Sequence, residues 1–400
     1  MRVAVVTGSR ADYGPLRPIL AALSAHPAFE PRLLVTAMHL DPTYGDTVGE
    51  IVADGHSIAA YVPAGGPMRR PGDFARNLAE ATLAFAGALA ACEPDLLLVL
   101  GDRFEILAAA LAATDLGLPI AHVHGGELSE GSLDDATRHC VTKLAHLHFV
   151  ATRTYAERVC QLGEDPSRVY VVGAPGLESI ESVGLLDRPA LASALALEEL
   201  PAPLIALTFH PASRRADLAG AQTRALTAGV EEVLAGAGCV VITLPNDDPG
   251  NATVREKLSH WAGARENVHA FAALGQQRYL SLLRHADVVL GNSSSAIIEA
   301  PSFRVPVVNV GERQRGRVMA ANVLGCTGET SAIVAALRRA LEPAFRASLA
   351  SLENPYDQGG AAARILAVLS SVSPRELSDK RFFDLSDMPW RAQLQFAVPR

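Results

Sequence analysis

Residues 288–317 read VVLGNSSSAIIEAPSFRVPVVNVGERQRGR, and their pattern identifies the class of fold. The apolar run at 288–290 predicts a buried parallel strand, and Gly291 permits a sharp turn into a run of serines. These serines can cap a helix whose first turn is expected at 296–299. A second strand is predicted at 305–310. Because a strand, a helix and a strand follow one another so closely, the stretch indicates an α/β fold.

The turn between these two strands has the features of an anion site. The unpaired backbone N–H groups and the positive dipole end of the helix point above the sheet, where a phosphate or diphosphate would fit. Arg313, Arg315 and Arg317 follow the second strand and bring guanidinium groups to the same edge. An ordinary serine cap beside a solvated arginine loop is the alternative. Glu299 together with the basic loop favours the phosphate site.

The composition narrows the class of protein. The chain has 400 residues, of which 49% are hydrophobic and only 5% aromatic, which predicts about two domains of alternating helices and parallel strands. The net charge of −8 argues against non-specific nucleic-acid binding, since no global positive field attracts a polyanion. The five scattered cysteines, the lack of a signal peptide and the lack of a membrane-length apolar run predict a cytoplasmic protein without membrane association.

Strand and helix patterns alternate in two series along the chain. The first occupies residues 1–180 and the second residues 204–369, which predicts two Rossmann-like domains. The proline-containing segment 181–203 is the expected linker, and the polar tail 370–400 is expected to pack back on the body. The strand candidates are 3–6, 33–36, 96–100, 120–124, 147–151 and 170–172 in the first series, and 204–209, 240–244, 268–270, 288–290 and 305–310 in the second.

Polar and charged residues follow nearly every predicted strand. In open α/β sheets, ligands bind outside the carboxyl ends of the strands, so these residues are site candidates. Packing alone explains such a concentration poorly. In chain order the segments are 8–13, 101–103, 122–127, 210–211, 245–248 and the turn after residue 290.

Asp102 is a candidate general base. It follows the apolar strand at 96–100 and one glycine, so it should be partly desolvated at the sheet edge. Capping the helix that begins near Phe104 is an equally good interpretation. Arg103 beside it can pair with a carboxylate or bind a phosphate, and a single arginine does not decide between these roles.

The histidines and acids near residue 124 form a second group of candidates. His122 and His124 lie two residues apart on a predicted strand, and a histidine pair by itself does not make a metal site. No third ligand falls at a recognised spacing, so no metal is predicted. Glu127 and Asp134 are acids close to a glycine pair that would let the backbone approach a ligand. His210 ends a strand and could donate to a phosphate. A G-x-G-x-x-G fingerprint is missing, which discounts NAD.

Seven motifs, taken in order, resemble the hydrolysing UDP-N-acetylglucosamine 2-epimerases. Members of that family open bacterial sialic-acid synthesis, and close relatives act on diacetamido sugars for legionaminic acid. The likeness runs from the first strand to residues 354–356 and reappears in KRFFDL at 380–385. The motifs are VTGSRADYG at 6–14, GDRFE at 101–105, HVHGGE at 122–127, DDATRH at 134–139, KLAHLHF at 143–149, FHP at 209–211 and GNSSS…EAPSF…GERQRGR at 291–317.

The resemblance implies a fold, a reaction and an assembly. The fold is two Rossmann-like domains facing across a cleft, as in the paired-lobe glycosyltransferases, without a metal or redox cofactor and as a homodimer or homotetramer. UDP is eliminated from UDP-N-acetylglucosamine to give a 2-acetamidoglycal, and water then adds with inversion at C2 to release N-acetylmannosamine. A UDP- or GDP-linked diacetamido sugar is the alternative substrate. A non-hydrolysing epimerase, a glycosyltransferase and a non-catalytic regulator that binds a UDP-sugar are the alternative functions.

The resemblance also assigns roles to residues. Asp102 and Asp134 match two acids of the family. Where several relatives have glutamate in an H-x-E-G-G motif, this chain has His124, so either His124 or Glu127 would complete the acid–base set. Contacts with the nucleotide or its diphosphate are implied for Arg10, Arg103, His210, Asn246, Ser293, Ser294 and Arg313, and contacts with the ribose hydroxyls for Glu299.

Overall fold

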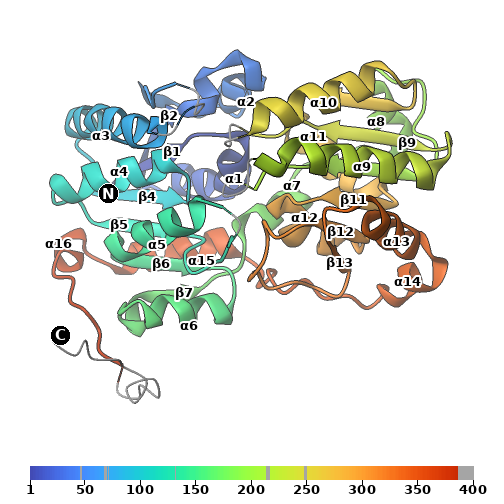
Figure 1. Ribbon diagram of the computed structural model, residues 1–400. Coiled ribbons are helices and arrows are strands. Elements are labelled where there is room, and N and C mark those ends of the chain that lie inside the picture. Colours follow the sequence, from blue (N-terminus) through green and yellow to red (C-terminus); the bar gives the residue numbers. More distant parts are fainter. Residues whose placement is uncertain are drawn as a thin grey trace, which may run out of the picture.

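Two parallel sheets, one in each lobe, form the framework of the protein (Figure 1). The computed structural model describes residues 1–45, 47–66, 70, 72–130, 132–212, 217–246 and 250–385. The first sheet has the strand order β3-β2-β1-β4-β5-β6-β7 and the second the order β10-β9-β8-β11-β12-β13. Neighbouring strands are parallel in both sheets, which confirms the predicted α/β class with two Rossmann-like lobes.

Helices cover both faces of the first sheet, so its central strands are apolar on both sides. Strand β4, with the sequence LLLVL, is buried at every residue. The strands are β1 (Arg2–Thr7), β2 (Glu30–Thr36), β3 (Ile58–Val62), β4 (Leu96–Leu100), β5 (Ile120–Val123), β6 (Leu147–Val150) and β7 (Val169–Val171). The helices between them are α1 (Arg10–Ala25), α2 (Thr47–Ala53), α3 (Asp73–Cys92), α4 (Phe104–Asp115), α5 (Asp134–Leu144) and α6 (Arg153–Gln161).

The second lobe repeats this arrangement after α7 (Glu178–Ser182). Its strands are β8 (Leu204–Thr208), β9 (Cys239–Thr243), β10 (Val268–Phe271), β11 (Val288–Gly291), β12 (Val307–Val310) and β13 (Val323–Cys326). Its helices are α8 (Arg188–Ala194), α9 (Ala219–Leu234), α10 (Asn251–Gly263), α11 (Gly275–His285), α12 (Ser294–Ile298), α13 (Thr330–Leu341) and α14 (Pro343–Ser348). Short 3-10 turns complete several connections.

Strands β3 and β13 were not predicted from the sequence. Both are edge strands. The side chains of β3 alternate between partly buried and exposed up to the buried Val62, and those of β13 are at most partly buried. Their sequences, IAAYV and VLGC, are apolar but contain small residues, so they lack the unbroken run of large aliphatic side chains that marks central strands such as β4. The predicted strand at 305–310 is also shorter in the structure, because β12 begins at Val307.

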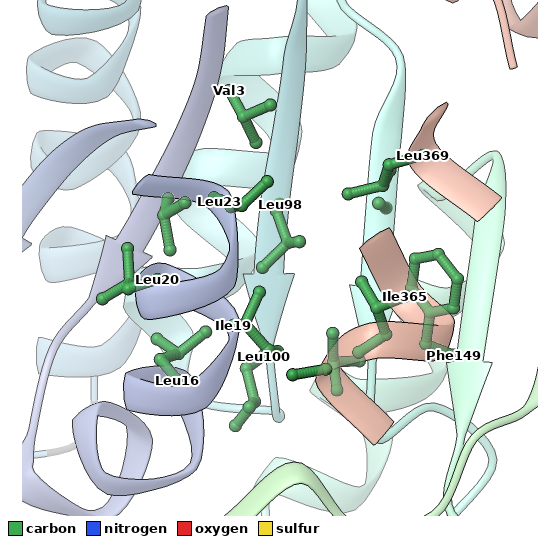
Figure 2. Packing of buried hydrophobic residues seen from close by; sticks show 14 of the residues in the cluster. Val3, Leu16, Ile19, Leu20, Leu23, Leu98, Leu100, Phe149, Ile365 and Leu369 are labelled. Atoms are coloured by element: carbon green, nitrogen blue, oxygen red, sulfur yellow. The ribbon is translucent and has the colours of Figure 1, made fainter. Parts of the chain in front are cut away.

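The last long helix, α15 (Ala361–Ser371), lies on the first lobe although it follows the second lobe in sequence. Ile365 and Leu369 of this helix belong to the same buried cluster as Ile19 of α1 and Phe149 of β6 (Figure 2). Conversely, α8 lies within the expected linker, yet its Leu191 is buried in the core of the second lobe. The chain thus returns to the first lobe after the second is complete, and the domain limits drawn from the sequence stay a prediction.

The described part of the tail follows α16 (Pro374–Leu377) and contacts the first lobe. Lys380 donates hydrogen bonds to the carbonyl oxygens of Lys143 and Ala145 and pairs with Glu164 at 2.8 Å. The backbone N–H of Phe383 donates to the carbonyl oxygen of Gly163 at 2.9 Å. The rest of the tail, residues 386–400, lies outside the described residues, so the expectation that it packs on the body concerns only residues 370–385 here. Within the described ranges, no helix has both the length and the apolar character needed to cross a membrane.

Candidate active site

The predicted site residues meet where the strand order reverses in each sheet. Strands β1 and β4 are neighbours in the first sheet, and β8 and β11 are neighbours in the second, so the loops that follow them open a crevice on each side. One pocket between the lobes is lined from both crevices. It brings together Arg10, Asp102, Arg103, His124, Glu127, Asp134, His210, Asn246, Ser293, Ser294, Glu299 and Arg313. Their chemical roles stay predictions.

On the second-lobe side, Gly291 allows the end of β11 to lie very close to β8, because it has no Cβ atom. Its φ is +133°, and a Cβ atom at this position would lie 1.9 Å from the carbonyl oxygen of Thr208. Just beyond it, the Asn292 side chain accepts from the backbone N–H of His210 at 2.7 Å and donates to its carbonyl oxygen at 2.8 Å. Arg313 donates to the carbonyl oxygen of Asn292 at 3.2 Å. The histidine and the arginine are therefore tied to the same loop.

The helix after this loop is short. Ser293 is the N-cap of α12 and accepts from the N–H of Ser295 at 3.4 Å. The helix begins at Ser294 rather than at Ala296, so the predicted start was two residues late, and it ends before Glu299. A proline at 301 falls just beyond, at the start of a 3-10 turn, which explains the early end.

Glu299 is a half-buried carboxyl group that is bound by a chain of hydroxyl groups. Ser295 donates to Glu299, and the hydroxyl groups of Ser295 and Tyr279 are 2.7 Å apart. Burial raises the pKa of Glu299 to about 7, and the hydrogen bond from Ser295 only partly opposes this. The group is therefore poised between its charged and neutral forms near neutral pH.

Glu127 on the first-lobe side is the opposite case. Its Oε1 lies 2.6 Å from Nδ1 of His124, its Oε2 lies 2.6 Å from Arg317 of the second lobe, and Arg138 is 4.0 Å away. Burial by itself raises the pKa of Glu127, but Arg317, His124 and Arg138 outweigh it and hold the pKa well below its usual range. Glu127 is thus a fixed anion that orients the imidazole.

His124 stands at the end of β5 with a φ of +66°, an uncommon conformation for a residue with a side chain. Such strain often accompanies function. His122 points elsewhere: its Nε2 lies 2.8 Å from the carbonyl oxygen of Gly101, and Thr142 lies 3.2 Å from its Nδ1. Burial lowers the pKa of His122 to about 3, so it is neutral and holds the loop before Asp102.

Asp102 is paired with Arg138 and does not cap α4. The N-cap of α4 is Arg103, which makes no side-chain cap, so the capping interpretation of Asp102 is wrong. Asp134 accepts from the hydroxyl of Ser132 at 2.9 Å at the start of α5. Both carboxylates line the pocket on the same side as His124.

The two first-lobe arginines among the predicted site residues, Arg10 and Arg103, both donate hydrogen bonds to other groups of this chain. Arg103 donates from Nε to Glu105 at 2.7 Å, and both residues are buried. Arg10 reaches across the cleft and donates to the carbonyl oxygens of Leu244, at 2.7 Å, and of Ala272. Burial lowers the pKa of Arg10 to about 10, so it still carries a positive charge at neutral pH. Of the predicted segment 245–248, residues 247 and 248 lie outside the described residues.

The structure places several further residues in the pocket to which the sequence analysis assigned no individual role. Arg317 and Arg138 neutralise the first-lobe acids, while Tyr279 supports Ser295. Asp12 also lines the pocket, and burial raises its pKa to about 7. A signal existed only for Arg317, through the basic loop. No group of three or more His, Cys, Asp or Glu side chains arranged to hold a metal occurs within the described ranges.

Comparison with known proteins agrees with this geometry. Residues 21–370 match the family model described as UDP-N-acetylglucosamine 2-epimerase. The UDP-N,N'-diacetylbacillosamine 2-epimerase (hydrolyzing) of Legionella pneumophila is 35% identical over 93% of this chain and 96% of its own length. The UDP-N-acetylglucosamine 2-epimerase of Neisseria meningitidis is 32% identical, over 96% of this chain and 99% of its own length.

Solved structures show the same fold. The structure of the UDP-GlcNAc 2-epimerase from Neisseria meningitidis bound to UDP-GlcNAc has a TM-score of 0.80 at 21% identity, covering 93% of this chain and 100% of that one. The S. aureus MnaA–UDP structure has a TM-score of 0.77 at 19% identity, covering 93% and 97%. These values support the paired-lobe fold that the motifs predicted. The chain belongs to the UDP-N-acetylglucosamine 2-epimerase family, and the resemblance to its hydrolysing members is confirmed.

Proposed function

We propose that the protein is a hydrolysing 2-epimerase of a UDP-linked 2-acetamido sugar. The proton on C2 is removed and the C1–O bond breaks, which leaves a C1–C2 double bond and frees UDP. Water then adds at C1, and a proton returns to C2 from the opposite face. The products are UDP and the free C2-inverted sugar, so UDP-N-acetylglucosamine would give N-acetylmannosamine.

The second lobe would hold the departing nucleotide. Ser293, Ser294, His210 and Arg313 surround the loop after β11, where donors and positive charge can stabilise a leaving diphosphate. The half-buried Glu299 suits the ribose, because a carboxylate accepts hydrogen bonds from two neighbouring hydroxyl groups. The S. aureus and Neisseria meningitidis structures contain UDP and UDP-GlcNAc respectively, which supports this choice of nucleotide.

The observation that carries the proposal is the His124–Glu127–Arg317 arrangement beside Asp102. An elimination followed by protonation from the other face needs two acid–base groups, each worth about 10²–10⁴-fold in rate. Glu127 is poorly suited to exchange protons near neutral pH, because its charge is fixed by Arg317. His124 therefore completes the acid–base set with Asp102, and Glu127 orients the imidazole through Nδ1.

Asp134 completes the first-lobe face. It lies at the start of α5, the helix that also carries Arg138, and it accepts from Ser132. We assign it to the hydroxyl groups of the sugar or to the entering water rather than to C2. The acid–base work on C2 then rests on Asp102 and His124, as the shared pocket allows.

A diacetamido sugar is the second candidate substrate. The Legionella pneumophila relative, which matches this chain along nearly its whole length, is named for UDP-N,N'-diacetylbacillosamine. A Campylobacter jejuni relative, 30% identical over 81% of this chain, is named for GDP- or UDP-linked forms of the same sugar. Both relatives are described as hydrolyzing, which favours hydrolysis over an epimerase that leaves the sugar nucleotide intact.

The test is turnover of a substrate panel in D2O, followed by NMR. UDP-N-acetylglucosamine and the UDP- and GDP-linked diacetamido sugars are each supplied. We expect nucleotide release and a free sugar with inverted C2 and one deuterium on C2. In a parallel reaction in ¹⁸O-labelled water, the released UDP should contain no label, because the C1–O bond is the one that breaks. Label in the UDP phosphate would contradict the elimination.

The same panel separates the other functions. An intact epimerised sugar nucleotide would show a non-hydrolysing epimerase. Nucleotide release that requires an acceptor would show a glycosyltransferase. Tight UDP binding without turnover of any donor would show a regulator. The matched control is Asp102→Asn, which should bind UDP as the wild type does but incorporate no deuterium.

A further inference from the structure

A closed ring of hydrogen bonds lies behind the Glu127–Arg317 ion pair. The backbone N–H of Val318 donates to the hydroxyl of Tyr155 at 3.0 Å, and the hydroxyl of Tyr356 donates to the carbonyl oxygen of Val318 at 2.8 Å. The two hydroxyl oxygens are 2.7 Å apart. Both tyrosines are fully buried, with an exposed fraction of 0%.

The direction of every bond in this ring can be deduced. A phenol has one hydrogen, and that of Tyr356 is used on the carbonyl oxygen of Val318. Tyr155 must therefore donate to Tyr356, while its own oxygen accepts from Val318. The three bonds run head to tail, an order in which each bond polarises the next. Removing either hydroxyl breaks the circuit.

The ring connects elements from distant parts of the chain. Tyr155 is on α6 of the first lobe, Val318 ends the basic loop after β12 of the second lobe, and Tyr356 precedes α15. Tyr155 and Tyr356 belong to one buried apolar cluster that also contains Ile297 of α12. The ring thus pins the second-lobe loop to the first lobe at their junction.

Tyr155 also supports the other partner of the ion pair. Gly126, which precedes Glu127, has a φ of +75°, and a Cβ atom there would lie 2.4 Å from the carbonyl oxygen of Tyr155. The backbone of Tyr155 therefore packs against Gly126, directly before Glu127, and its hydroxyl accepts a hydrogen bond from Val318, directly after Arg317. The same residue fixes both members of the pair.

We propose that Tyr155 and Tyr356 are positioning residues that hold Arg317 against Glu127 and so keep His124 oriented for proton transfer. This inference rests on the proposed function. The ring itself touches no substrate, because its hydroxyl groups are spent on each other and on Val318. Its effect on the reaction passes through Arg317, which adjoins Val318 in the chain and lies 2.6 Å from Glu127.

The expected signature is a change in how Glu127 titrates. The groups that face Glu127 are Arg317 from the basic loop, His124 from its own loop, Arg138 from α5, and the two tyrosines. If the ring is broken and Arg317 moves away, less positive charge offsets the effect of burial, so the pKa of Glu127 rises. As the pH falls through the raised pKa, Glu127 takes up a proton and no longer orients His124. Activity is then lost on the acid side.

The experiment compares Tyr155→Phe, Tyr356→Phe and the double variant with the wild type. Tyr170→Phe is the matched control, because it removes a phenol hydroxyl from β7 of the same lobe that takes no part in the hydrogen-bond ring. The aromatic ring of Tyr170 packs on Phe149. We expect each single variant to lower kcat about tenfold. UDP affinity should stay unchanged, and a new loss of activity should appear at acid pH. The control should behave as the wild type.

Coupling between the two tyrosines gives a further readout. Each substitution removes the bond that the two hydroxyls share. The fold-decrease in kcat of the double variant should therefore be smaller than the product of the two single fold-decreases, and its fall in Tm smaller than the sum of the two single falls. Additive losses would mean two independent packing roles and would overturn the ring. Unchanged pH profiles in both variants would overturn the positioning role.

A titration that needs no turnover separates this inference from the proposed function. Carboxyl-¹³C glutamate NMR can follow Glu127, with Glu127→Gln to assign the signal. In Tyr155→Phe and Tyr356→Phe the pKa of Glu127 should rise toward its ordinary value, whether or not any sugar nucleotide is consumed. Turnover failure in the wild type would refute the function alone. A Glu127 titration identical in all variants would refute the positioning role alone.

Discussion

Glu127, which is buried, and Glu299, which is half-buried, line one pocket from opposite lobes, yet their surroundings shift their pKa values in opposite directions. Burial raises the pKa of both. Around Glu127 this is overturned by Arg317, His124 and Arg138, whereas Glu299 has only the hydroxyl of Ser295 to oppose it. Charge partners, rather than depth, therefore decide which carboxyl group is a permanent anion.

The difference fits a division of work between the lobes. A carboxylate that stays ionised can hold a histidine in one orientation. A carboxyl group whose pKa lies near 7 becomes ionised more readily when a ligand donates hydrogen bonds to it. On this account the first lobe moves protons and the second lobe holds the nucleotide.

The largest effect is expected for Asp102→Asn. The amide keeps the size of the side chain but cannot accept the C2 proton, so kcat should fall about 10²–10⁴-fold. Because Asp102 belongs to the first lobe, the affinity for UDP, measured by calorimetry, should be nearly unchanged. A loss of UDP affinity as large as the loss of kcat would argue against the division between the lobes.

Arg317→Met should destabilise the protein by about 3–5 kcal/mol, because it leaves Glu127 charged and buried without its main partner. Denaturant unfolding of the wild type and the variant measures this difference. The control is the double variant Arg317→Met with Glu127→Gln, which removes the stranded charge and should recover most of the loss. No recovery would mean that Arg317 acts through packing instead.

The smallest effect concerns Glu299→Gln and pH. Ribose hydroxyls bind best to the ionised carboxylate, so UDP affinity of the wild type should rise as the pH increases through about 7, the pKa of Glu299. The variant should bind UDP about tenfold more weakly and lose this part of the pH dependence. Comparing the two proteins cancels the ionisation of the UDP phosphate itself. Parallel pH curves would rule out Glu299 as the ribose partner.

Stability gives an independent check on Glu299. Its pKa is raised in the folded protein, so the folded state binds the proton more tightly than the unfolded chain does. This contribution favours folding at low pH and is lost as the pH rises from the ordinary glutamate pKa toward about 7. Over that window, Glu299→Gln should gain stability relative to the wild type as the pH increases.

Much of the site could be predicted from the sequence because of how parallel sheets are built. Apolar runs such as Leu96–Leu100 and Val288–Leu290 identify central strands, and the residues just after them must lie at one edge. That rule alone brought Asp102, His210 and Ser293 into the candidate set before any contact was known. The structure places all of them around one pocket.

The interactions that escaped prediction join segments that are distant in the sequence. Arg317 meets Glu127 only because the second lobe folds against the first, and no local pattern reports that pairing. Helix α15 has the apolar face of any core helix, and only the structure shows that Ile365 packs in the first lobe. The choice between His124 and Glu127 stayed open for the same reason, since it depends on the cations that face Glu127.

The most direct test of the contrast is one carboxyl-¹³C NMR titration of the wild type that follows both glutamates. Glu127→Gln and Glu299→Gln assign the two signals. We predict that Glu299 titrates near pH 7, whereas Glu127 stays ionised far below the ordinary glutamate pKa, down to the acid limit of folding. Two glutamates that titrate together near the ordinary value would contradict the account, because the proposed orienter and the proposed ribose partner would then be alike.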